Sequence, residues 1–176
     1  MGTSRYGRTS ADLDLFTDAY RITGRVLIGA GGFQAELENT SSSYLEMEDV
    51  YISRINQPGE IVASYPTAVF RKDNINFIML QDKRPGSGGG GVQFSRPLFT
   101  RGRPVTVFLT VPSFEIRGEV QQEGKVVLRE LLAKSPGQFQ PLQAAQASAS
   151  LYPDISYSSD VLFVHKERIG IFCLAS

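Results

Sequence analysis

Cysteine, histidine and tryptophan are almost missing from this 176-residue chain, which has one cysteine, one histidine and no tryptophan. A single cysteine excludes a disulfide framework within one chain, and we interpret Cys173, in an apolar stretch, as a small core side chain. With His165 as its one histidine, the chain has almost no material for a histidine-based metal cluster or a catalytic triad. We therefore predict no catalytic residue, no metal site and no cofactor, and we expect a protein that is not an enzyme.

An excess of charge and a long apolar run are missing as well. Lys and Arg together number 18, as do Asp and Glu, so the formal net charge is zero and no overall field attracts a polyanion. The N-terminus lacks the apolar run of a signal peptide, and no stretch approaches the roughly 18 apolar residues of a membrane span. We expect a cytoplasmic protein without a membrane partner, and any nucleic-acid contact would need a local basic patch.

The apolar residues that are present, 41% of the chain, alternate with polar ones more often than they follow a helical period. This pattern predicts a mainly β fold. Residues 12–17 fit a half-buried strand, although Ser10 could instead begin a short capped helix. Residues 33–37 and 125–132 are also predicted as strands.

A constant offset of 94 positions relates two distant segments. Residues 68–80 and 161–174 each consist of an apolar strand, a charged turn and a second apolar strand, with Lys166 placed 94 positions after Lys72. The same offset separates Gly118 from Gly24, and each of these glycines interrupts an alternating strand. Because a glycine inside a strand marks a bend or a close approach of another backbone, both halves are predicted to bend there.

The offset divides the chain into four predicted parts. Residues 1–11 are a flexible tail, 12–81 a first β-barrel repeat, 82–102 a Gly-rich linker and 103–176 a second β-barrel repeat. The glycines of the linker could instead suggest a phosphate-binding loop, but that motif needs Gly-Lys-Ser/Thr at the start of a helix. A flexible connector is the better interpretation.

The second half, with Arg103-Pro-Val-Thr-Val-Phe-Leu-Thr-Val, Phe114-Glu-Ile-Arg-Gly-Glu-Val and Val161-Leu-Phe-Val-His-Lys-Glu-Arg-Ile-Gly-Ile, is similar to the Sm-like family. It looks in particular like the Hfq-like bacterial RNA chaperones. The resemblance implies a strongly bent five-stranded barrel with glycine in its second strand. The two halves also resemble the general class of duplicated, uncharacterised bacterial small-barrel proteins, whose family name implies no activity.

The same resemblance implies a candidate RNA site. In the family, the basic turn between strands four and five lines the pore of a ring and holds uridine-rich RNA. The matching positions here are Phe70, Arg71 and Lys72 in the first half, and His165 and Lys166 in the second. The second half departs from the pattern: Val164 replaces the aromatic residue, and residues 139–160 form an insertion for such a barrel.

These observations predict two tandem Sm-like or SH3-like small barrels that act as a non-catalytic binding or scaffold module. Because small barrels leave strand edges without partners, we expect the halves to pair edge to edge. Chains are expected to associate further into a dimer or ring, or to engage a protein partner. Single-stranded RNA binding through the two charged turns is the alternative.

Overall fold

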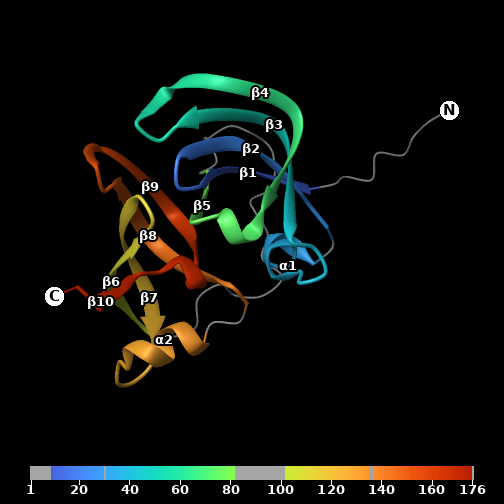
Figure 1. Ribbon diagram of the computed structural model, residues 1–176. Coiled ribbons are helices and arrows are strands. Elements are labelled where there is room, and N and C mark those ends of the chain that lie inside the picture. The colour runs from blue at the N-terminus through green and yellow to red at the C-terminus, as the bar shows by residue number, and fades with distance from the viewer. Residues whose placement is uncertain (1–8, 30, 82–101, 135–136, 176) are drawn as a thin grey trace, which may run out of the picture.

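The computed structural model describes residues 9–29, 31–81, 102–134 and 137–175. Ten strands form one open antiparallel sheet in the order β10-β6-β7-β8-β9-β5-β1-β2-β3-β4 (Figure 1). The elements are β1 (Thr9–Phe16), β2 (Tyr20–Ile28), α1 (Gly32–Glu38), β3 (Tyr44–Arg54), β4 (Gln57–Arg71), the 3₁₀ turn η1 (Lys72–Asn74), β5 (Phe77–Leu80), β6 (Arg103–Val111), β7 (Phe114–Gln122), α2 (Leu128–Lys134), β8 (Phe139–Ala149), β9 (Tyr152–His165), the 3₁₀ turn η2 (Lys166–Arg168) and β10 (Ile171–Leu174). The mainly β prediction is confirmed.

The same series of elements occurs twice. Strands β1 to β5 lie in the order β5-β1-β2-β3-β4, and strands β6 to β10 lie in the matching order β10-β6-β7-β8-β9. The halves meet where β5 pairs antiparallel with β9, Phe77 opposite Val164 and Met79 opposite Leu162. This pairing, called the inner junction below, confirms that the halves join edge to edge. That each half is a small barrel stays a prediction.

Strand β5 supplies side chains to two hydrophobic cores. Ile78 and Leu80 pack in the core of the first half, whereas Phe77 and Met79 pack in the core of the second. Neighbouring side chains of a strand point to opposite faces, so a single strand can serve both cores. In return, Phe163 of β9 packs in the first core.

The two strand glycines allow close packing, as predicted. A Cβ added at Gly24 would lie 2.9 Å from Met47 Cε and 3.0 Å from the carbonyl oxygen of Glu48. At Gly118 it would lie 3.0 Å from Leu142 Cβ. The pairing register shifts beside each glycine, on β3 and on β8. Both halves are therefore bent at the same place, where a side chain would not fit.

The strands predicted at residues 33–37 and 125–132 are wrong, because the first segment lies within the helix α1 and the second overlaps the helix α2. Phe33 and Leu37 are four residues apart and both buried, so they share one helical face, and Leu128 and Leu131 are three apart. Such short segments fit both the helical period and the strand period. Strand β1 also begins at Thr9, inside the predicted tail.

Most of two predicted parts of the chain lies outside the described residues: 1–8 of the predicted tail and 82–101 of the predicted linker. The predicted insertion at residues 139–160 lies in the long hairpin β8–β9, which matches β3–β4 in the first half. The helices α1 and α2, with seven residues each, are too short to span a bilayer, and the described part of the chain has no longer α-helix. A cytoplasmic location stays a prediction.

Candidate binding surfaces

The first charged turn buries the lysine that was expected to face RNA. Lys72 is 4% exposed, and its Nζ donates hydrogen bonds to the carbonyl oxygens of Glu36 and Asn39, both at 2.9 Å. These carbonyls lie at the C-terminal end of α1, where helix carbonyls lack partners within the helix. Burial lowers the pKa of Lys72, while the Glu36 carboxylate raises it. Lys72 therefore caps a helix.

The second charged turn buries its histidine. His165 is 1% exposed, its ring lies 4.9 Å from that of Phe139, and its Nδ1 accepts a hydrogen bond from the backbone N–H of Glu167 at 3.2 Å. Its Nε2 finds no hydrogen-bond partner among the described residues. Burial is the main cause that lowers the pKa of His165, and the carboxylates of Glu167 and Asp73 oppose it. A neutral, structural imidazole follows from this environment.

The remaining candidates divide by exposure. Phe70 is half-buried and packs against the first core, and Lys166 is half-buried with its pKa lowered mainly by burial. Arg71 is exposed, with its Nε 3.9 Å from Asp73 Oδ2. The turns lie near each other, because the backbone N–H of His165, beside the second turn, donates to the carbonyl oxygen of Asn76, which follows the first, at 3.0 Å. Among the five candidates, Arg71 alone is exposed, and RNA contact stays a prediction.

A polar cluster that the sequence did not reveal ties the halves together. Asn76 is fully buried, and its Nδ2 donates to Asp18 Oδ1 and to the carbonyl oxygen of Pro112, both at 3.0 Å. Arg168 donates from Nε to Asn76 Oδ1 at 2.9 Å and from Nη2 to Asp18 Oδ1 at 2.5 Å. The Ser113 hydroxyl donates to the carbonyl oxygen of Asp18 at 2.8 Å. The cluster joins two elements of each half.

Strands β4 and β10 are the edges of the sheet, each paired on one side in the described part of the chain. Both carry exposed apolar side chains: Ile61, Val62, Tyr65 and Val69 on β4, and Ile171 and Leu174 on β10. Unpaired edge backbone next to apolar side chains is a template for another strand. We call these two strands the outer edges.

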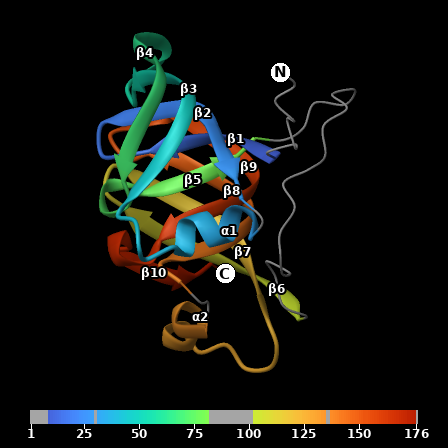
Figure 2. The ribbon, with the colours of Figure 1, turned by 90° about the vertical axis from the view of Figure 1, so that its right-hand side faces the viewer.

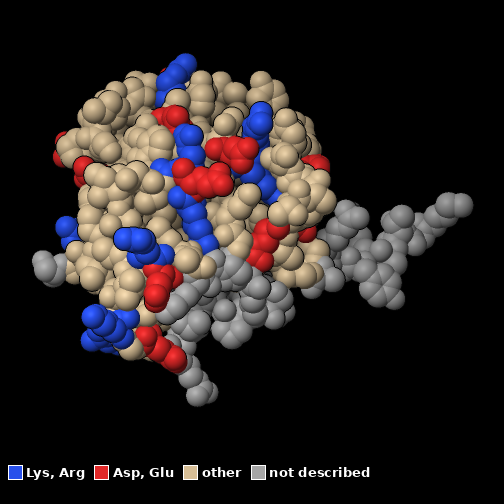
Figure 3. All heavy atoms as spheres, turned by 60° about the horizontal axis from the view of Figure 1, so that its bottom comes forward, with Lys and Arg blue, Asp and Glu red and all other residues tan. Residues whose placement is uncertain are grey.

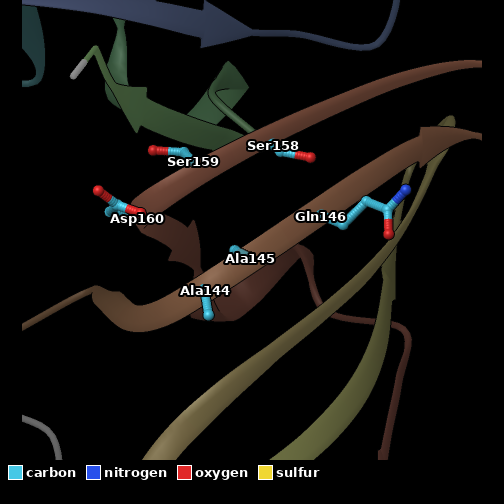
Figure 4. Close-up of a pocket in the computed structure, with 6 residues that line it drawn as sticks. All are labelled: Ala144, Ala145, Gln146, Ser158, Ser159 and Asp160. Carbon is cyan, nitrogen blue, oxygen red and sulfur yellow. The ribbon is translucent and has the colours of Figure 1, made fainter.

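A hollow of about 290 Å³ between β8 and β9 is lined by Ala144, Ala145, Gln146, Ser158, Ser159 and Asp160 (Figure 4). Ser159 Oγ lies 2.9 Å from the carbonyl oxygen of Leu80 and 2.8 Å from that of Val161, so its single hydrogen already has acceptors within the chain. Asp160 is the sole ionisable side chain of the lining, which leaves no acid–base pair. Elsewhere in the described ranges, no group of three or more His, Cys, Asp or Glu could hold a metal.

Comparison of the chain with protein-family models, curated protein sequences and solved structures finds no match. Of the surfaces described, the outer edges combine unpaired backbone with exposed apolar side chains. The charged turns are largely occupied by contacts within the chain.

Proposed function

We propose that this protein is a non-catalytic scaffold, made of two tandem Sm-like or SH3-like barrels joined in one sheet, that binds other protein strands and self-associates through its outer edges. The observation that carries the proposal is the contrast in burial between equivalent strands. All four residues of β5 are buried, whereas two of the four residues of β10 are exposed. A strand added to β10 or β4 would cover apolar surface and pair the free backbone groups.

The charge distribution favours a protein partner over RNA. On the face shown in Figure 3, Lys and Arg side chains are interspersed with Asp and Glu and form no broad area of one sign. Single-stranded nucleic acid needs a positively charged groove that follows its backbone. Burial of Lys72 and His165 removes two of the basic side chains that such a groove would use.

The test is the molar mass of the intact chain, measured by light scattering over a range of protein concentrations at low and high salt. We expect a mass greater than one chain that rises with concentration and changes little with salt, because edge pairing depends on backbone hydrogen bonds and apolar contact. Val69→Lys and Ile171→Lys should each lower the mass. Leu151→Lys is the matched control, because Leu151 is exposed but lies in the β8–β9 turn.

A chain that remains a single species of monomer mass at high concentration would overturn self-association. The RNA alternative is tested in parallel with a labelled uridine-rich oligonucleotide. Tight binding that weakens steeply with salt and is lost in Arg71→Ala would assign the function to RNA instead.

A further inference from the structure

We propose that β10 of one chain pairs antiparallel with β4 of a second copy, head to tail, in the register that β5 and β9 adopt at the inner junction. The proposal rests on the proposed self-association and specifies its surfaces and its register. The template is visible within the chain, because β5 and β10 occupy the same place in their halves, as do β9 and β4. The outer edges β10 and β4 are therefore equivalent to the two strands of the inner junction, but each lacks a strand to pair with.

Side chains cross the inner junction in both directions. Phe77 and Met79 of β5 pack in the core of the second half, and Phe163 of β9 packs in the core of the first. The ring of Phe163 meets that of Phe33 on α1, with centroids 5.4 Å apart. Each half thus completes the core of the other.

The equivalent positions on the outer edges are apolar and uncovered. Ile171 lies 94 positions after Phe77 and is 56% exposed, and Cys173, 94 after Met79, is half-buried. Val69 lies 94 positions before Phe163 and is 59% exposed. An apolar side chain is solvated at each of these positions, where the inner junction buries its equivalent.

The two residues of the Phe33–Phe163 contact also have apolar, exposed equivalents. The position 94 residues after Phe33 is Val127, beside α2, which is 41% exposed. If β10 and β4 pair as β5 and β9 do, Val127 of one chain faces Val69 of the next, as Phe33 faces Phe163. The two exposed valines would thereby cover each other, which no pairing of β10 with itself would provide.

The placement of the two edges requires a second copy. Strands β4 and β10 are at the two ends of the sheet order, and both views show β4 at the top of the molecule and β10 towards its bottom (Figures 1 and 2). One chain therefore does not satisfy its own edges. Because the two surfaces differ, the contact is heterologous and adds chains in one direction until the rotation closes a ring.

The copied register places Cys173 opposite Ala68 of the next chain, as Met79 lies opposite Leu162. At the inner junction, the backbone N–H of His165 donates to the carbonyl oxygen of Asn76, three pairs away from Met79 and Leu162. Hydrogen-bonded and non-hydrogen-bonded pairs alternate, so this pair is non-hydrogen-bonded, with Cα atoms about 4.5 Å apart. That separation lies within the range of about 4.4–6.8 Å that a disulfide spans.

The first experiment introduces Ala68→Cys into the intact chain, whose single natural cysteine is Cys173. Under mild oxidation, we expect covalent dimers and larger species on a non-reducing gel, because a disulfide joins Cys173 of each chain to position 68 of the next. Val69→Cys, whose side chain points to the opposite face, should give no ladder. Ala68→Cys with Cys173→Ser should also give none.

The second experiment uses two blocked chains, which need not be cross-linked. Val69→Lys blocks β4 and leaves β10 intact, whereas Ile171→Lys blocks β10 and leaves β4 intact. Each alone should have the mass of one chain, and an equimolar mixture should form a one-to-one dimer through the two intact edges. Circular dichroism of each variant confirms that it is folded.

The outcomes separate this inference from the proposed function. A wild-type oligomer without the Ala68→Cys ladder, or blocked chains that do not complement each other, would overturn the head-to-tail register and leave self-association standing. A disulfide-linked dimer of the double variant, Ala68→Cys with Cys173→Ser, would indicate β4 paired with β4, and would overturn it as well. A wild-type monomer at all concentrations would overturn both.

Discussion

The inner junction and the outer edges use equivalent strands, but the inner junction has two additions. The first is aromatic: Phe77 stacks on Phe16 with centroids 4.3 Å apart and meets Phe114 edge-on at 4.9 Å. The residues equivalent to Phe16 and Phe77 on the outer side are Thr110 and Ile171. Fewer large rings would be buried there.

The second addition is polar. The buried Asn76, hydrogen-bonded to Arg168 and Asp18, has Gly170 as its equivalent, so no side chain could repeat the cluster between chains. Buried polar groups with all partners in place help to specify one arrangement. The inner junction is therefore built to be permanent, whereas contacts at the outer edges should be weaker and reversible.

The largest effect is expected from Phe77→Ala. Removal of a fully buried ring between Phe16 and Phe114 should lower the free energy of unfolding by about 3–5 kcal/mol. The matched variant is Ile171→Ala, at the exposed equivalent position, which should cost about 0.5 kcal/mol or less in dilute solution. Urea unfolding of both measures the difference, and equal losses would remove the distinction between the two sites.

Asn76→Ala should have the next largest effect. It leaves the Asp18 carboxylate and the Arg168 guanidinium without a shared partner, and the expected loss is about 1–3 kcal/mol. Asn74→Ala, an exposed asparagine in the adjacent turn, is the control and should change stability little. If the two losses match in urea unfolding, the polar cluster does not hold the junction.

Lys72→Met tests the support of α1, the helix that places Phe33 against Phe163. The variant keeps the length of the apolar stem but loses two hydrogen bonds to helix carbonyls, so a loss of about 1–2 kcal/mol is expected. Arg71→Met, next to it but exposed, should be close to neutral. Thermal unfolding of the two variants would contradict the capping role if Arg71→Met were the more damaging.

The smallest effect is a pH dependence at the inner junction. Burial lowers the pKa of His165 below its ordinary 6.5, so the unfolded chain takes up this proton before the folded chain does. The contribution to stability is complete above pH 6.5 and is lost as the pH falls through the pKa of the folded state. His165→Asn keeps an oxygen that can accept from the backbone N–H of Glu167 but does not titrate.

The measurement is the melting temperature of both proteins from about pH 8 to about pH 5. The wild type should lose more of its melting temperature than His165→Asn does over this range. Parallel curves would show that His165 does not couple folding to pH.

The strands and their bends could be predicted because their signals are local. Alternation of apolar and polar residues identified β2 and β7. Gly24 marked the place where β3 packs closely on β2, and Gly118 the place where β8 packs closely on β7. The helices were missed because a seven-residue segment such as α1 has one apolar pair, Phe33 and Leu37, which is too little to reveal a period.

The burial of the charged turns could not be predicted for a different reason. Lys72 is satisfied by carbonyl oxygens of Glu36 and Asn39, more than 30 positions earlier, and backbone acceptors leave no pattern in a sequence. The contacts of Asn76 with Pro112 and Arg168 span 36 and 92 positions. Such contacts exist only after the sheet has formed, so charged turns were interpreted as exposed.

Strand β5 couples the unfolding of the two halves. Ile78 completes one core and Phe77 the other, so melting of this four-residue strand opens both cores at once. The halves should therefore unfold in a single cooperative transition, although their elements repeat. Calorimetry should show one peak whose calorimetric and van't Hoff enthalpies agree. Neither half should fold when it is expressed without the other, since each core would lack the side chains that the other half contributes.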